Sequence, residues 1–211
     1  IGGAGGDLIR GGANDDWIAG DNAQLDFVPI SGNDGATRIA SIATLAATQG
    51  GADSLYGDGG ADVIFGGAFS DRIDGNQGDD LIFGDAVQLS WRAGDIRNPR
   101  FQTLSGTQIY SNSADNSNGA DRVDGTARNY RNADGSAPAA WANWQIQNLF
   151  HTLAIQASND NSFGNDYIAG GAGNDEIFGQ LGDDIIQGDG SADIGVGALR
   201  DGSNNLFLIP S

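Results

Sequence analysis

Aspartates recur at a nine-residue spacing along much of this chain, each one following a glycine-containing turn. In GGAGNDEIFGQLGDDIIQGDGSAD, residues 170–193, they are Asp175, Asp184 and Asp193. Glycine lets such a turn direct carbonyl oxygens inward, and carbonyl and carboxylate oxygens are the ligands that a hard cation such as Ca²⁺ prefers. Good turn-forming propensity alone explains an enrichment in Gly and Asp, but not a fixed register. The spacing therefore predicts a row of cation sites.

The nine-residue unit occurs ten times, with Asp always in its sixth place and Ile, Leu or Val always in its eighth. An eleventh unit, starting at residue 188, keeps Asp193 but has Gly195 in place of the aliphatic residue, so the array ends there. The candidate metal ligands are these aspartates and those of the turns that follow a block. They are Asp7, Asp16, Asp21, Asp53, Asp62, Asp71, Asp80, Asp85, Asp121, Asp166, Asp175, Asp184, Asp189 and Asp193.

The unit resembles the nonapeptide of the repeat-in-toxin (RTX) family, Gly-Gly-x-Gly-x-Asp-x-aliphatic-x. The resemblance covers about half of the chain. It implies an all-β fold, a parallel β-roll or β-solenoid in which six residues form a turn, three form a strand, and two units complete one coil. It also implies Ca²⁺ between stacked turns, about six or more ions here, bound by backbone carbonyls and by Asp carboxylates two units apart.

Turns two units apart give six expected aspartate pairs. These are Asp7 with Asp21, Asp53 with Asp71, Asp62 with Asp80, Asp71 with Asp85, Asp166 with Asp184, and Asp175 with Asp193. The chain departs from the family pattern at Phe69, which stands where the family has glycine, and a bulky residue is costly at positive φ. Thr48, Asn116 and Asn161 replace the first glycine of their units.

The repeats form four blocks, residues 1–22, 48–85, 116–125 and 161–196, in one elongated segment that spans residues 1–211. The intervening stretches are 23–47, 86–115, 126–160 and 197–211. Each of them follows a glycine turn, alternates in polarity, reaches a polar turn and returns on apolar residues, which predicts β-hairpin excursions from the roll. The last hairpin, through LFLIP at 206–210, is expected to lie over the final coil.

Residues 139–157 allow two alternatives. The stretch could be a short helix, because one face of it would carry residues at roughly three- and four-residue spacing: Trp141, Trp144, Leu149, Phe150 and Leu153. The two tryptophans could pack the excursion against the roll, or could offer a stacking platform to a sugar ring. His151, the single histidine, has no nucleophile placed beside it, and we expect a structural role for it.

Charge and composition exclude several classes of function. The chain has 28 acidic and 10 basic residues, a net charge of -18, and no cysteine. This balance disfavours nucleic acid as a partner, and no apolar run is long enough for membrane insertion. Without a zinc-binding cluster, a thiol or a phosphate-binding lysine, no catalytic constellation is present, so we expect no enzymatic activity.

We therefore expect a calcium-binding structural segment of a large secreted or cell-surface protein, such as an adhesin stalk, a surface-layer component or an extracellular filament. The alternative is a calcium-triggered folding and export module of a secreted enzyme or toxin whose catalytic domain lies outside this chain. Because the chain starts inside a full repeat, Ile1 is expected to continue a longer polypeptide or to meet a neighbouring copy head to tail.

Overall fold

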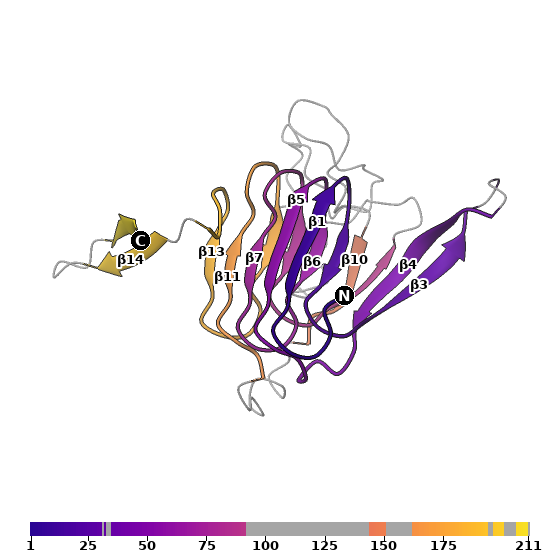
Figure 1. Cartoon of the computed structure of the whole chain (residues 1–211), viewed down its shortest axis with the longest axis horizontal. Coiled ribbons are helices and arrows are strands. Elements are labelled where there is room, and N and C mark those ends of the chain that lie inside the picture. The colour runs from indigo at the N-terminus through magenta and orange to yellow at the C-terminus, as the bar shows by residue number, and fades with distance from the viewer. Residues whose placement is uncertain are drawn as a thin grey trace, which may run out of the picture.

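The computed structural model describes residues 1–30, 32, 35–91, 144–150, 162–193, 196–200 and 206–210, and the described residues form an all-β fold. The chain winds back and forth between two parallel sheets (Figure 1). One sheet has the order β1-β5-β7-β11-β13, with strands Leu8–Ala13, Ser54–Gly59, Arg72–Asp74, Tyr167–Ala169 and Ile185–Gln187. The other has the order β12-β8-β6-β2, with strands Glu176–Phe178, Leu81–Phe83, Val63–Phe65 and Trp17–Ala19.

The repeat register continues unbroken across two long insertions. Residues paired between β5 and β7 are 18 positions apart, which is two nine-residue units. Partners in β1 and β5 are 46 apart, and partners in β7 and β11 are 95 apart. These separations are 18 plus 28 and 18 plus 77, so insertions of 28 and 77 residues leave the stacking of the sheets unchanged. β2 pairs with β6, and β8 with β12, with the same two offsets.

In eight of the repeat units, the aliphatic residue in the eighth place packs between the two parallel sheets. Ile18, Leu55, Ile64, Ile73, Ile82 and Ile168 form one buried cluster, with Ile9 and Ile177 packed against it. Most of these strands are only three residues long, β1 and β5 have six, and each strand of the cluster contributes one such side chain. Complete burial of an aliphatic side chain of this size stabilises the fold by about 1.5–3 kcal/mol. This narrow column is the interior that the repeat pattern predicts.

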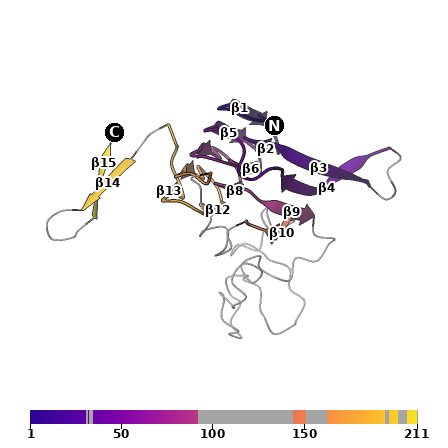
Figure 2. The same cartoon turned by 90° about the horizontal axis from the view of Figure 1, so that it is seen from below.

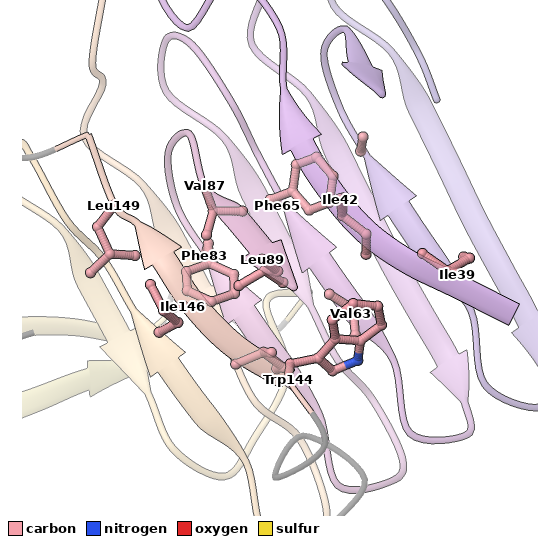
Figure 3. Packing of buried hydrophobic residues seen from close by; sticks show 12 residues of the cluster. Ile39, Ile42, Val63, Phe65, Phe83, Val87, Leu89, Trp144, Ile146 and Leu149 are labelled. Carbon is pink, nitrogen blue, oxygen red and sulfur yellow. The ribbon is translucent and has the colours of Figure 1, made fainter. Parts of the chain in front are cut away.

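The insertions contribute strands to one shared sheet, in which residues 23–29 and 37–44 form the first expected hairpin. Strands β3 (Ala23–Pro29), β4 (Thr37–Thr44), β9 (Gln88–Trp91) and β10 (Trp144–Asn148) form an antiparallel sheet in the order β10-β9-β4-β3. This sheet covers the outer face of the four-stranded parallel sheet, so the described fold has three layers (Figure 2). A second core joins them, in which Ile42 and Leu89 pack with Val63, Phe65 and Phe83 (Figure 3).

Two expectations about local structure are wrong. Within 139–157, Trp144–Asn148 is the strand β10 and not part of a helix, because its alternate residues Trp144 and Ile146 are buried against the second core. At the C-terminal side, β14 (Val196–Arg200) and β15 (Leu206–Pro210) form the expected antiparallel hairpin. The hairpin projects away from β13 (Figure 1) and leaves Ile186 48% exposed, so it does not lie over the final coil.

Candidate calcium centre

A ladder of aspartates runs along the turns that lead into the five-stranded sheet. The N–H of Asp7 donates to Oδ1 of Asp53 at 2.7 Å, and the N–H of Asp53 donates to Oδ1 of Asp71 at 2.8 Å. The N–H of Asp71 donates to Oδ1 of Asp166 at 2.9 Å, and that of Asp166 to Oδ1 of Asp184 at 3.0 Å. Each carboxylate therefore links its own turn to the turn stacked beside it.

A second ladder runs along the turns that lead into the four-stranded parallel sheet. The N–H of Asp16 donates to Oδ1 of Asp62 at 2.8 Å. The N–H of Asp62 donates to Oδ1 of Asp80 at 2.8 Å, and that of Asp80 to Oδ1 of Asp175 at 3.0 Å. The Asp in the sixth place of the repeat thus links neighbouring turns in both rows, because it always stands directly before a strand.

The other carboxylate oxygen of most ladder residues is buried and has no hydrogen-bond partner among the described residues. This holds for Oδ2 of Asp7, Asp16, Asp53, Asp62, Asp71, Asp80 and Asp166. A buried polar atom without a partner costs free energy, on the order of 1–3 kcal/mol and more when it is charged. Seven such atoms in register require a common explanation, and a positively charged ligand is the simplest one.

Main-chain oxygens surround the same positions. A Cβ atom on Gly57 would lie 2.3 Å from Oδ2 of Asp62 and 2.6 Å from the carbonyl oxygen of Gly75, which belongs to the next turn. The equivalent atom on Gly66 would lie 2.2 Å from both Oδ2 of Asp71 and the carbonyl oxygen of Gly84. Glycine is therefore required in the first place because a side chain would fill the space where these oxygens converge.

Burial raises the pKa of seven ladder carboxyls above the ordinary value, those of Asp53, Asp62, Asp71, Asp80, Asp166, Asp175 and Asp184. Desolvation is the largest cause, neighbouring carboxylates add to it, and the main-chain N–H donors oppose it. The pKa is about 9 for Asp71, about 8 for Asp80, about 7 for Asp166, and about 6 for Asp53 and Asp62. A bound cation reverses this effect, because its charge favours the ionised carboxylate.

The donor set fits Ca²⁺ better than a transition metal. No three His, Cys, Asp or Glu side chains converge on one point in the described ranges, so carbonyl oxygens must supply much of any coordination there. All the ligands on offer are oxygens, from carboxylates and glycine carbonyls, and Ca²⁺ takes six to eight oxygens in flexible arrangements. Zinc prefers nitrogen and sulfur, and the chain has one histidine and no cysteine.

Comparison with known protein families finds the RTX calcium-binding nonapeptide repeat in four copies, at residues 1–23, 47–73, 56–86 and 160–194. These segments are RTX calcium-binding repeats. They contain both ladders, and they confirm the family resemblance of the sequence. None of the curated proteins and none of the solved structures gives a significant match to this chain.

Three of the six expected aspartate pairs are joined in the RTX ladders: Asp53 with Asp71, Asp62 with Asp80, and Asp166 with Asp184. The other three pairs lack this hydrogen bond, although the turns that they were expected to join do meet. Cβ atoms on Gly2, Gly66 and Gly170 would lie within 2.5 Å of Oδ2 of Asp7, Asp71 and Asp175 and of the carbonyl oxygens of Gly20, Gly84 and Gly188, respectively. Asp7 pairs with Asp53 across the first insertion instead of with Asp21, and Asp71 pairs with Asp166 across the second instead of with Asp85. Asp175 and Asp193 are not joined, because Asp193 contacts Tyr56 and Arg72 instead. Asp121 and Trp141 lie outside the described residues.

The two parallel sheets and the turns that connect them are called the RTX core below. Asp21 and Asp85 lie where the insertions leave this core. Asp21 accepts hydrogen bonds from the N–H groups of Gly51 and Ala68, and Asp85 accepts one from the N–H of Leu181 at 2.8 Å. Both carboxylates are buried, and desolvation raises the pKa of Asp85 to about 8. These hydrogen bonds fix the turn at the point where each insertion begins. The chain therefore re-enters the stack in register after 28 or 77 inserted residues.

Each repeat unit that follows an insertion takes its first-place glycine from the segment that precedes the insertion. Gly20 lies against Asp53, and Gly84 lies against Asp166, in the same relation that Gly57 has to Asp62. Gly20 therefore fills the first place that the repeat pattern assigns to Thr48, and Asn161 lies outside the described residues. Phe69 adopts φ 72° and its N–H donates to the carbonyl oxygen of Ser162 at 2.7 Å, so its turn is kept despite the bulky side chain.

The last RTX turn lies on the outer face of the five-stranded sheet. Asp193 accepts a hydrogen bond from the hydroxyl of Tyr56 at 2.9 Å and forms an ion pair with Arg72 at 3.1 Å. The buried carboxylate of Asp74 accepts from the hydroxyl of Ser191 at 2.6 Å. Asp189 is exposed. These contacts direct Asp193 away from the ladder that ends at Asp175.

Sequence reasoning missed a second row of linking side chains in the fifth place of the RTX unit. The N–H of Ala61 donates to Oδ1 of Asp15 at 2.9 Å, and that of Asn174 donates to Oδ1 of Asp79 at 2.8 Å. The N–H of Asp183 donates to Oδ1 of Asn165 at 2.9 Å. The available signal was the frequency of Asp and Asn in that place, which turn propensity alone had seemed to explain.

Proposed function

We propose that this chain is a calcium-stapled parallel β-roll, which acts as a non-catalytic structural segment of a large secreted or cell-surface protein. The observation that carries the proposal is the series of buried Oδ2 atoms that have no hydrogen-bond partner among the described residues. Each Oδ2 atom lies close to the first-place glycine of its own turn. Where this glycine packs against the neighbouring turn, a carbonyl oxygen of the neighbouring turn is equally close. Calcium bound there would tie consecutive coils together.

The residues that would hold Ca²⁺ are the ladder aspartates, through Oδ2, and the first-place glycines, through their carbonyl oxygens. When bound, the ion supplies positive charge that neutralises neighbouring carboxylates and replaces the missing hydrogen-bond donors. Each ion would remove two units from the net charge of -18. Because the oxygens converge only in the stacked turns, the free energy of binding adds to the free energy of folding.

An extracellular location follows from the calcium concentrations that such a fold needs. Extracellular calcium modules of modest affinity bind at about 10⁻⁴ to 10⁻³ M, far above the calcium concentration of cytosol. With 28 acidic groups, the metal-free chain repels itself, and it has no disulfide to restrain it. The three-layer packing around the insertions supports a rigid structural segment. Among the described residues, no helix could span a membrane.

The test is a calcium titration of the whole chain followed by far-UV circular dichroism, with Mg²⁺ as the matched control. We expect a cooperative gain of β structure in the submillimolar to millimolar range with Ca²⁺ and no comparable gain with Mg²⁺, which demands a smaller and more regular oxygen shell. An unchanged spectrum and melting temperature after chelation, with loss of metal verified by elemental analysis, would contradict the proposal.

A further inference from the structure

A pocket of about 360 Å³ lies between the RTX core and the layer built by the insertions. Its floor and walls come from both layers: Trp17 of β2 and Val63 of β6 on one side, and Phe27, Arg38 and Trp91 of β3, β4 and β9 on the other. This volume is at the small end of the range for ligand pockets, about 300–1,000 Å³. We refer to it as the interlayer pocket.

Four of the eleven residues that line the interlayer pocket are aromatic. Trp91 is half-buried and meets Trp144 edge to face, with ring centroids 5.3 Å apart. Trp144 is buried, so it supports Trp91 instead of offering a free ring face of its own. Trp17 is 41% exposed and Phe27 is 60% exposed. Two large aromatic surfaces therefore remain open to solvent at one pocket.

The polar groups at the interlayer pocket include one donor and one acceptor without a complete set of partners. The Arg38 guanidinium lies 5.1 Å from the Trp91 ring centroid, and its Nη1 is buried with no hydrogen-bond partner in the described part of the chain. Asp15 is exposed and uses Oδ1 to accept from the N–H of Ala61. Arg38 thus offers hydrogen-bond donors to a ligand in the pocket, and Asp15 offers an acceptor.

This combination selects an uncharged ligand with a flat apolar face and several hydroxyl groups. Arg38 disfavours a cation, although the aromatic rings alone would attract one. Asp15, Asp62 and the net charge of -18 disfavour an anion. The C–H face of a pyranose ring stacks on an aromatic side chain, and its hydroxyls both accept and donate hydrogen bonds.

We propose that the interlayer pocket binds a neutral pyranose, a hexose or N-acetylhexosamine unit of a glycan, with Trp17 stacked on the ring and Arg38 and Asp15 bonded to its hydroxyls. The site rests on the proposed calcium-dependent fold, because Ala61, Asp62 and Val63 at its edge belong to an RTX turn and strand. Calcium is expected to act on sugar binding through the folding of this wall, without contacting the sugar.

The experiment uses saturation-transfer NMR and tryptophan fluorescence on the whole chain in millimolar Ca²⁺, with methyl glycosides of glucose, galactose, mannose and N-acetylglucosamine as probes. We expect at least one glycoside to bind with a Kd on the order of 1 mM, the range of a single-ring ligand with few contacts. Trp17→Ala and Arg38→Met should each weaken binding by about tenfold. Phe69→Ala is the matched control, because Phe69 is 42% exposed but lies outside the pocket.

The outcomes separate this proposal from the proposed calcium-dependent fold. A normal calcium response in circular dichroism with no saturation transfer to any neutral glycoside would overturn the sugar site alone. Tighter binding of glucuronate or tetramethylammonium than of every neutral glycoside would overturn its assignment to an uncharged ligand. Equal losses in Phe69→Ala and Trp17→Ala would show that the sugar binds elsewhere. If Trp17→Ala fails to fold in calcium, Arg38→Met still decides between these results.

Discussion

The N–H of Asp71 donates to Oδ1 of Asp166 at 2.9 Å, although 95 positions of sequence separate the two residues. The bond has the same length and role as the bond from Asp53 to Asp71, whose residues are 18 positions apart. A 77-residue insertion therefore leaves the aspartate ladder intact. The contact places Asp71 near the middle of the five-rung ladder, and there the effects of calcium should be largest.

Asp71→Asn is expected to have opposite effects with and without calcium. In the metal-free fold, the pKa of Asp71 is about 9, so folding at neutral pH requires protonation, and Asn avoids that cost. We expect the metal-free variant to be more stable than the wild type by about 1–3 kcal/mol. In calcium, the variant should lose stabilisation, because a charged ligand is missing. Denaturant unfolding with chelator and with calcium measures both changes.

The matched control is Asp183→Asn, which removes the same charge from an exposed side chain in the fifth place of a repeat. It should change either stability by less than about 0.5 kcal/mol. Equal losses of calcium stabilisation in Asp71→Asn and Asp183→Asn would show that acidity as such, and not the ladder, determines the response.

The metal-free fold should become less stable as pH rises. The folded-state pKa is about 9 for Asp71, about 8 for Asp80 and about 8 for Asp85, all above the ordinary 3.8. Between about pH 4 and 9 the folded chain thus holds more protons than the unfolded chain, and its stability is lost as pH rises through this window.

Thermal melting in chelator at about pH 5 and pH 8 checks this sign, and the melting temperature should be higher at pH 5. In calcium the trend should be reversed, because metal binding releases protons from the carboxyls. A metal-free melting temperature that increases from pH 5 to pH 8 would show that these carboxyls are not buried as described.

Gly57→Ala should weaken calcium binding, because it changes the main-chain packing of the turns and removes no carboxylate. The added Cβ would lie 2.3 Å from Oδ2 of Asp62 and 2.6 Å from the carbonyl oxygen of Gly75, so the stacked turns must move apart. We expect a loss of about 2–4 kcal/mol in calcium and a weaker calcium midpoint. Gly188→Ala is the control, since its Cβ would have no atom within 4 Å. A harmless Gly57→Ala would rule out this close approach.

Leu89→Ala tests whether the insertions are integral to the fold. Leu89 is fully buried between the antiparallel sheet and the RTX core. Its truncation should cost about 2–5 kcal/mol and lower the single unfolding transition of the whole chain. Leu45→Ala, at a position 44% exposed, should cost much less. If Leu89→Ala leaves the main transition unchanged and melts only a separate phase, the insertion sheet folds independently of the roll.

The nine-residue register determined the two parallel rows of turns, their interior and the aspartates of the two ladders. A turn of six residues with glycine and a terminal Asp, followed by three residues with a central aliphatic, has few ways to satisfy its backbone and bury its side chain. Asp53, Asp62 and Ile64 therefore occupy the places that the repeat predicts. These are local rules applied many times, and for that reason they can be read from the residues alone.

Tertiary structure alone decided which distant turns stack and what covers the roll. No local pattern predicts that Asp7 contacts Asp53 or that Asp71 contacts Asp166. The entropic cost of closing a long loop depends only weakly on its length, so insertions of very different lengths are compatible with the same stacking. Nor does the pattern show that β3, β4, β9 and β10 join in one sheet over Val63 and Phe83. Edge pairing and burial between segments far apart in sequence select that layer, and they make both the second core and the interlayer pocket.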